Sequence, residues 1–302
     1  MTTKSAPAGL TIRPFDDSDR GYEASVGIWD ANWPDEPSSV EGMRYANARR
    51  SERHFFRRMM ADLGYDVVAT AIYRSPEWCT EPGMYDVQIR VLPEFQRRGI
   101  GTALYDHIID ELAKLEQKPT KIVSDAREDQ PHSVKFLTGR GFKQVQRQTV
   151  SRLDLASFDP APFADAVGRF EESGIVVKTL EEFESEDPDA RRKAHAAFVE
   201  LHRDVPLFTD RMEITYELFE KELDAPNRLP GGFFLAFDGD EVIGTTSLWK
   251  RISDPRRLDT GLTGVARSHR RRGIATALKV RAMEFAKGLG AREVSTDNEE
   301  SN

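Results

Sequence analysis

The sequence predicts an α/β (α+β) protein of two tandem domains, each a mixed, mostly antiparallel sheet flanked by helices. A length of 302 residues favours two domains of ordinary size. One segment, residues 91–104, recurs at residues 265–278. Around both copies, strand-like patterns alternate with helix-like ones, and hairpin signals indicate that the sheets are mixed.

The repeated segment has the same glycine-containing centre in both copies. VLPEFQRRGIGTAL (91–104) aligns without gaps with VARSHRRRGIATAL (265–278), at an offset of 174. Internal repeats indicate duplicated structural units. We therefore expect an N-terminal domain over residues 1–155, a linker with a docking helix over residues 156–173, and a C-terminal domain over residues 174–302.

In the N-terminal copy, strands and helices follow in a regular order. The expected strands are residues 10–13, 55–60, 67–72, 85–91 and 121–124. A turn containing Gly64 joins the second strand to the third and indicates a hairpin. The helix after the repeated loop has apolar residues at the spacing of a buried stripe. These residues are Ile100, Leu104, Ile108 and Leu112.

The C-terminal copy repeats this order. Its expected strands are residues 175–178, 233–237, 242–244, 259–265 and 293–296. Asp238, Gly239 and Asp240 separate two apolar runs, which is a strong hairpin signal. Aligning residues 295–297 with 123–125 places Asn302 opposite Gln130. We therefore expect the C-terminal domain to lack its last helix and strands.

Composition excludes several classes of protein. With 43 Lys and Arg against 51 Asp and Glu, the net charge is −8, which disfavours nucleic-acid binding as the main activity. The longest uncharged run, residues 229–237, is far shorter than the roughly 18 residues that span a bilayer. No secretory signal is visible near the N-terminus. A single cysteine excludes an internal disulfide, and no metal site is expected. The simplest interpretation is a cytoplasmic protein without nucleic-acid or membrane partners.

The repeated loop has the composition of an anion site. Glycines that open a helix let backbone N–H groups approach an anion, and adjacent arginines add charge. A single match is more often a capped helix with a solvated basic turn, but two copies in the same context argue against that interpretation. A Walker loop would need Gly-Lys-Ser/Thr, and a dinucleotide loop would need glycine at Leu104 and Leu278.

These blocks resemble a known family. QRRGIGTAL and RRRGIATAL are similar to the Q/R-x-x-G-x-G/A signature of the GNAT superfamily of N-acetyltransferases, and residues 130–142 resemble that family's fourth helix and Gly-Phe ending. The resemblance covers nearly the whole chain. It implies acetyl-CoA as co-substrate, with the pyrophosphate on the loops and the pantetheine arm beside the preceding strands. The implied coenzyme residues are Val91, Gln96, Arg97, Arg98, Gly99, Ile100, Gly101, Thr102, Val265, Arg270, Arg271, Arg272, Gly273, Ile274, Ala275 and Thr276.

The resemblance also implies a carboxylate base on the strand before each loop. Asp259 stands six residues before Val265, and Tyr85 stands six before Val91, with Asp86 beside it. Adjacent strand residues point to opposite faces, so Tyr85 and Asp86 cannot both face one site. The three catalytic candidates are therefore Asp259, Tyr85 and Asp86, and each could equally be an ordinary polar residue of a strand.

One departure from the family pattern concerns the general acid. The family often has a tyrosine in its fourth helix, where this chain has Leu137.

The leading hypothesis is an N-acetyltransferase that acts on a primary amine of a small molecule by direct attack, without an acyl-enzyme. Two alternatives remain open: an enzyme for protein or peptide amines, and a non-catalytic acyl-CoA-binding protein in which one or both domains are degenerate. Trp29 and Trp33 could line an acceptor pocket or belong to the core.

Overall fold

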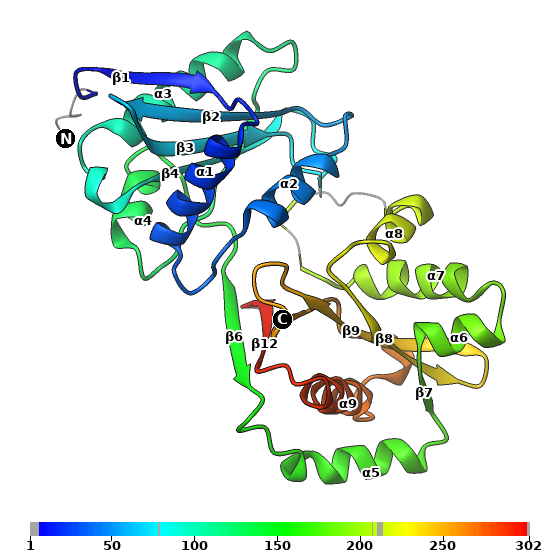
Figure 1. The fold of residues 1–302 in the computed structure, drawn as a ribbon. Helices are drawn as coiled ribbons and strands as arrows, with labels where there is room; N and C mark the ends of the chain where they lie inside the picture. The colour runs from blue at the N-terminus through cyan, green and yellow to red at the C-terminus, as the bar shows by residue number, and fades with distance from the viewer. Residues whose placement is uncertain (1–5, 78, 207, 210–213, 301–302) are drawn as a thin grey trace. The chain divides into compact units, whose positions relative to one another are not determined.

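The chain divides into two compact units in this computed structural model, which describes residues 6–77, 79–206, 208–209 and 214–300. Unit 1 comprises Met1–Val145 and Thr209–Met212, and unit 2 comprises Gln146–Phe208 and Glu213–Asn302. Each unit contains a mixed sheet with helices on both faces (Figure 1). The predicted α/β fold class is therefore confirmed.

Unit 1 is built on a sheet in the order β1-β2-β3-β4-β5. Its strands are β1 (Leu10–Pro14), β2 (Phe56–Leu63), β3 (Asp66–Arg74), β4 (Met84–Val91) and β5 (Lys121–Val123). Neighbouring strands are antiparallel except for the parallel pair β4–β5. The hairpin predicted around Gly64 is confirmed as β2–β3.

The helices of unit 1 cover two sides of this sheet. They are α1 (Asp19–Asn32), α2 (Val40–Ala48), α3 (Ile100–Lys114) and α4 (Pro131–Thr138). The predicted stripe of α3 is fully buried against the sheet. Helix α1 lies on the opposite face (Figure 1). Its Trp29 contacts Arg90 of β4.

Unit 2 contains a longer sheet, in the order β6-β12-β10-β9-β8-β7, with β11 paired to β9. Its strands are β6 (Gln148–Asp154), β7 (Val176–Thr179), β8 (Arg228–Asp238), β9 (Glu241–Lys250), β10 (Arg257–Thr260), β11 (Gly264–Val265) and β12 (Glu293–Glu299). The hairpin predicted at residues 238–240 is confirmed as β8–β9.

Helices also cover both faces of the second sheet. They are α5 (Ala164–Glu172), α6 (Leu180–Glu186), α7 (Ala190–His202), α8 (Tyr216–Leu223) and α9 (Ile274–Gly288). Helices α5 and α9 pack on one face, in a core that includes Phe170, Leu258 and Leu278. Helices α6, α7 and α8 pack on the other face, around Phe219 and Phe233.

Strand β6 completes the edge of the second sheet. It pairs antiparallel with β12 along its whole length, from Gln148 opposite Glu299 to Asp154 opposite Glu293. The strand thus fills a position beyond β12 where the sequence predicts missing structure. Because residues 148–154 were expected in the N-terminal domain, this pairing argues for an earlier boundary, and the exact domain limits stay a prediction.

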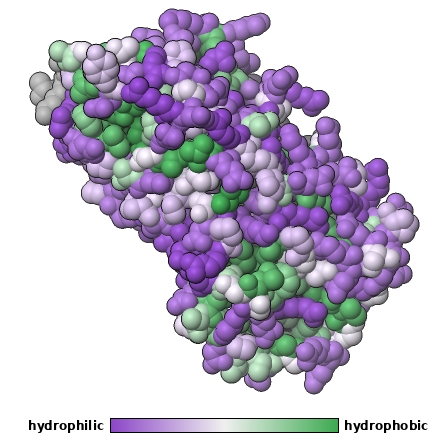
Figure 2. All heavy atoms as spheres, in the orientation of Figure 1, coloured by the Kyte–Doolittle hydropathy of each residue, from purple (hydrophilic) through white to green (hydrophobic). Residues whose placement is uncertain are grey.

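The surface drawn in Figure 2 is mostly hydrophilic, with smaller apolar areas among charged residues. Among the described residues, no helix is both long and apolar enough to cross a bilayer. The same part of the chain contains no group of three or more residues arranged to ligate a metal ion.

Candidate functional site

The two repeated loops have the same backbone conformation. Arg97 and Gly99 have φ angles of 62° and 89°, and Arg271 and Gly273 have φ angles of 64° and 81°. Positive φ is uncommon for arginine, so its recurrence at equivalent positions marks a specific loop geometry. Gly99 and Gly273 are the N-caps of α3 and α9, and neither makes a side-chain cap bond. The first N–H groups of both helices therefore remain available to an anion.

A neutral network braces the loop of unit 1. Gln96 Nε2 donates to the Val91 carbonyl at 3.0 Å, and Asn32 Nδ2 donates to the same oxygen at 3.1 Å. Gln96 Nε2 also lies 3.1 Å from Asn32 Oδ1. The first motif residue thus ties the loop to the end of β4 and to α1.

An ionic network braces the loop of unit 2. Arg270 Nε donates to the Val265 carbonyl at 3.0 Å, in the same role as Gln96. Asp204, which follows α7, pairs with Arg270 and accepts from Arg267 Nε at 3.2 Å. Hydrogen bonds from Arg267 and Arg270 lower the pKa of Asp204 to about 2.

The other predicted coenzyme residues fall into exposed and buried groups. The exposed ones are Arg97, Arg98, Arg271, Arg272 and Ala275. Ile100 and Ile274 are buried and anchor the first turn of α3 and α9. Each loop therefore presents arginine side chains to solvent while its helix is fixed in the core.

The helix starts differ in what covers them. A Cβ atom at Gly101 would lie 3.4 Å from the ring of Phe136 on α4. Thr102 Oγ1 accepts a hydrogen bond at 2.8 Å from Nη2 of Arg140, which follows α4 in the chain. In unit 2, Thr276 is half-buried. Helix α4 thus closes over the helix start of unit 1, whereas Ala275 of unit 2 is exposed.

In both units, the strand before the loop separates from its parallel neighbour. Strand β4 pairs with β5 only through residues 84–86 and 121–123. Strand β10 pairs with β12 only through residues 257–259 and 293–295. Beyond these positions no pairing between the two strands of each pair continues among the described residues.

The strand pairings make Asp86, not Tyr85, the equivalent of Asp259. In unit 1, Asp86 lies between Arg74 on β3 and Val123 on β5. In unit 2, Asp259 lies between Trp249 on β9 and Ser295 on β12. Five residues separate Asp86 from Val91, and six separate Asp259 from Val265.

The extra residue in unit 2 is a β-bulge. Thr260 pairs with Leu248, and Gly264 pairs with Thr245. The chain thus advances four residues from β10 to β11 while β9 advances three, so β10–β11 contains one extra residue. Strand β4 pairs with β3 from Asp86 to Val91 without any such shift. Because side chains alternate between faces, the bulge turns Asp259 away from the α9 core.

Tyr85 does not reach the face that carries Asp86. Its side chain is 3% exposed within the core beneath α3, and its hydroxyl donates to the Gln117 carbonyl at 2.7 Å. The structure therefore brings Asp86 and Asp259 to equivalent places and leaves Tyr85 in the core.

The face around Asp86 is filled by large polar side chains. Arg74 Nε donates to Asp86 Oδ2 at 3.0 Å, and burial raises the pKa of Asp86. Arg90 lies on the same face, with its guanidinium 4.3 Å from the ring centre of Trp29 and 5.3 Å from that of Trp33. The sequence left Trp29 and Trp33 open between core and pocket; in the structure both pack on the half-buried Arg90.

The carboxylate of Asp259 is also paired with an arginine but is more exposed. Arg251 Nε donates to both carboxylate oxygens of Asp259 at 2.9 Å, and the Asp259 side chain is 43% exposed. A Cβ atom at Gly261 would lie 2.3 Å from Ser247 Oγ and 2.7 Å from Trp249 Nε1. Gly261 therefore lets its strand pack closely on Ser247 and Trp249.

Two features of this site were not predicted from sequence. Arg251 lies eight residues before Asp259, outside any motif. Ser295 is 3% exposed, its hydroxyl has no hydrogen-bond partner among the described residues, and it lies beside Asp259 in the sheet. The only available signal was Gly261 and Gly264 within a strand, since such glycines often mark a bulge.

Comparisons with known proteins agree with this geometry. The acetyltransferase (GNAT) family model matches residues 18–142 and 195–302. A mycothiol acetyltransferase from Geodermatophilus obscurus is 28% identical over 253 residues, which cover 79% of this chain and 75% of that protein. A tandem GNAT protein from the clavulanic acid biosynthesis pathway superposes with a TM-score of 0.70 at 20% identity, covering 97% of this chain and 91% of that one.

A further solved structure contains the same fold within a much longer protein. It is the GCN5-related glucosamine N-acetyltransferase region of a fungal multi-domain GH3 beta-N-acetylglucosaminidase, with a TM-score of 0.71 and 15% identity. The likeness covers 96% of this chain and 35% of that protein. At these identities the two structural comparisons show the fold alone.

Proposed function

This chain belongs to the acetyltransferase (GNAT) family, and from that premise we propose that it transfers acetyl from acetyl-CoA to a primary amine of a small molecule, with the chemistry in unit 2. Its membership makes it an acyl-CoA-dependent acetyltransferase. The observation that carries the choice of unit is the exposure of the Asp259 side chain, 43%, compared with 8% for the Asp86 side chain.

The loop residues fit a coenzyme that carries phosphates. Both loops offer uncapped helix N-termini and exposed arginines, which together bind phosphate oxygens. The proposed phosphate-binding residues are those predicted from the motif, at 97–102 and 271–276. Gln96 and Arg270 act as braces through the carbonyls of Val91 and Val265.

When bound, acetyl-CoA supplies an activated acyl group, so this chain has to position the amine and handle its proton. An ionised carboxylate has about four acceptor directions, and the bidentate pair with Arg251 uses only part of them. Asp259 therefore keeps acceptor capacity for an incoming ammonium, which it orients and helps to deprotonate. No side chain is needed as a covalent carrier.

Ser295, the partner of Asp259 on the neighbouring strand β12, is the proposed donor. Its buried hydroxyl lies beside Asp259 and has no partner among the residues described. A buried, unpartnered hydroxyl is costly unless a ligand satisfies it. Unit 1 has Val123 at the equivalent position, which cannot donate.

The small-molecule acceptor is supported by the curated relative. Its name assigns it mycothiol, a small molecule, and it covers 79% of this chain. The two units then have different roles, because unit 1 retains the coenzyme loop but its carboxylate, Asp86, is buried. We propose that unit 1 binds acyl-CoA without turning it over.

The test combines coenzyme binding with turnover. Calorimetric titration with acetyl-CoA should give two sites per chain, and release of CoA should depend on an added amine from a panel of small molecules. Tight binding with no turnover on any amine would favour the non-catalytic alternative. Turnover that survives Asp259→Asn but not Asp86→Asn would move the chemistry to unit 1.

A further inference from the structure

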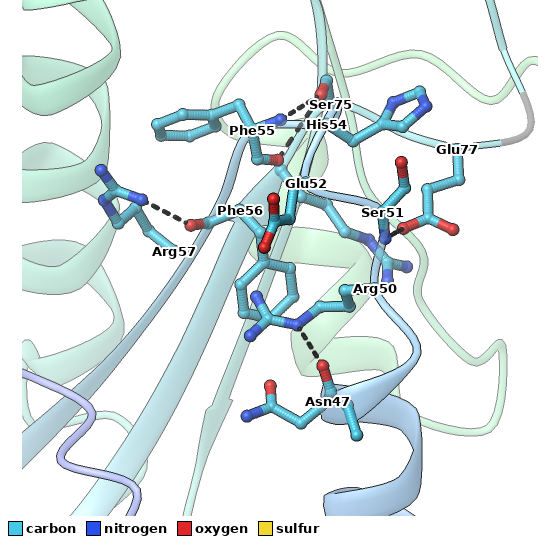
Figure 3. Close-up of a pocket in the computed structure, with 12 residues that line it drawn as sticks. Asn47, Arg50, Ser51, Glu52, His54, Phe55, Phe56, Arg57, Ser75 and Glu77 are labelled. Carbon is cyan, nitrogen blue, oxygen red and sulfur yellow. Dashed lines mark hydrogen bonds between the residues drawn. The ribbon is translucent and has the colours of Figure 1, made fainter.

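Unit 1 has a cavity that the proposed acetyl transfer does not use. It has a volume of about 430 Å³ and lies between the end of α2 and the strands β2 and β3 (Figure 3). This volume lies within the range of small-molecule sites, roughly 300–1,000 Å³. The side chains that line it and matter here are Asn47, Arg50, Phe55, Phe56, Arg57 and Arg74.

Arg50 is the most available cation of this cavity. Its guanidinium lies 3.6 Å from the ring centre of Phe56, and its Nε donates to the Asn47 carbonyl at 3.2 Å. Within the part of the chain that the structure describes, no carboxylate forms an ion pair with it. Stacking on Phe56 thus fixes the plane of the Arg50 guanidinium, and Arg50 lines the cavity (Figure 3).

A second arginine lies behind Phe56. Arg58 has two guanidinium nitrogens, Nε and Nη1, that are buried without a hydrogen-bond partner among the described residues. Its guanidinium lies 5.8 Å from the Phe56 ring centre. Burial lowers the pKa of Arg58; the charges of Tyr22 and Asp17 act against this shift, and those of Arg50 and Arg74 add to it. Two guanidinium groups therefore lie near the Phe56 ring, and Arg74 is the partner of Phe56 across the β2–β3 pair.

The acidic groups nearby do not cancel this charge. Asp86 pairs with Arg74, and the Oε1 atom of Glu77 accepts from the Ser51 backbone N–H at 3.2 Å. Glu52 is exposed at the rim. Asp17, the carboxylate whose charge acts on Arg58, accepts from the Tyr22 hydroxyl and from Asn47 Nδ2. Neither Arg50 nor Arg58 forms an ion pair with a carboxylate among the described residues, and a half-buried cation of this kind favours an anionic ligand.

We propose that this cavity binds a small molecule that carries a carboxylate or phosphate group. The oxyanion would lie against Arg50, in the field of Arg58 and Arg74, and an apolar part of the ligand would contact Phe55 and Phe56. The site is distinct from the coenzyme loop. Asp86, the partner of Arg74, precedes the end of β4 by five residues, which is about 16 Å along a strand.

Two matched anions and one neutral isostere test the proposal in the full-length chain. Phenylacetate, phenyl phosphate and phenylacetamide are titrated calorimetrically into the wild type, Arg50→Gln and Arg53→Gln. Arg53 is exposed in the same loop but does not line the cavity, so it controls for the change in net charge. At least one anion should bind the wild type about tenfold more tightly than phenylacetamide does, and the better anion identifies carboxylate or phosphate as the natural group.

The variants localise the binding. Arg50→Gln should weaken the anion about tenfold or more, and Arg53→Gln should leave its affinity within about twofold. Arg58→Met should also weaken it while raising the thermal midpoint of the ligand-free protein, because it removes an unsatisfied buried guanidinium. The proposal is overturned if neither anion binds at millimolar concentration, if phenylacetamide binds as tightly, or if Arg50→Gln binds like the wild type. Acetyl-CoA binding is independent of these outcomes, so a failure here leaves the proposed transferase intact.

Discussion

The two units share a loop and differ in the strand that leads to it. Both loops place an arginine and a glycine in left-handed backbone and open a long helix without a side-chain cap. Strand β4 reaches its loop in regular register, whereas β10 and β11 are separated by a bulge with glycine at positions 261 and 264. The equivalent carboxylates Asp86 and Asp259 both face away from the core helix, but the Asp86 side chain is 8% exposed and the Asp259 side chain 43% exposed, although the coenzyme loops are alike.

The largest effect is expected from a negatively charged side chain introduced into each coenzyme loop by substitution. Ala275→Glu should abolish both coenzyme binding in unit 2 and turnover, because it puts a carboxylate against the proposed phosphate site. Gly101→Glu should remove one binding site and leave turnover in place, with added crowding against Phe136. Calorimetric stoichiometry and CoA release measure the two effects. Unchanged acetyl-CoA affinity in both variants would reject the coenzyme loops.

The next largest effect concerns the two equivalent carboxylates. Asp259→Asn should lower kcat/KM by about 10²–10⁴-fold, the usual contribution of a positioned base, and the loss should be greater at low pH than at high pH. Asp86→Asn should leave kcat/KM within about twofold. A pH series of CoA release checks both variants. Equal losses would show that both units react.

A smaller effect is expected from filling the bulge. Gly261→Val would crowd Ser247 and Trp249, so the free energy of unfolding should fall by about 1–3 kcal/mol and turnover should fall with it. Gly288→Ala is the matched control, because a Cβ atom there meets nothing within 4 Å, and its effect should stay within about 0.5 kcal/mol. Denaturant unfolding measures both. A tolerated valine with full activity would mean that the open face is not needed.

The smallest expected effect is a difference in how the stability of the two loop networks depends on pH: the ionic network of Asp204 in unit 2 and the neutral Gln96–Asn32 network in unit 1. Because hydrogen bonds from two arginines lower the pKa of Asp204 to about 2, its carboxylate contributes stability above its unfolded pKa near 4. That contribution is lost as the pH falls from about 4 towards 2. Asp204→Asn should remove this part of the acid dependence, whereas the Gln96–Asn32 brace contains no group that titrates there. Unfolding curves from pH 5 to 2 should therefore differ in slope, and identical slopes would contradict the ionic brace.

The catalytic candidates show how far sequence reasoning reaches. Counting back six residues from each loop gave Asp259 and Tyr85, which assumes that both strands have the same register. The bulge breaks that assumption, so Asp86 takes the place that alignment gave to Tyr85. Arg251 and Arg50 lie outside every motif and acquire their roles only through contacts made in the fold.

Local pattern by itself determined the duplication, the order of strands and helices, and the two loops, because periodicity and glycine positions act within a few residues of the chain. The tertiary structure alone decided three further features. It placed β6 beside β12, it made Asp86 and Asp259 equivalent, and it gathered Arg50, Arg58 and Arg74 around Phe56. Each of these depends on pairing between distant segments, and a single extra residue reverses which face a strand side chain meets.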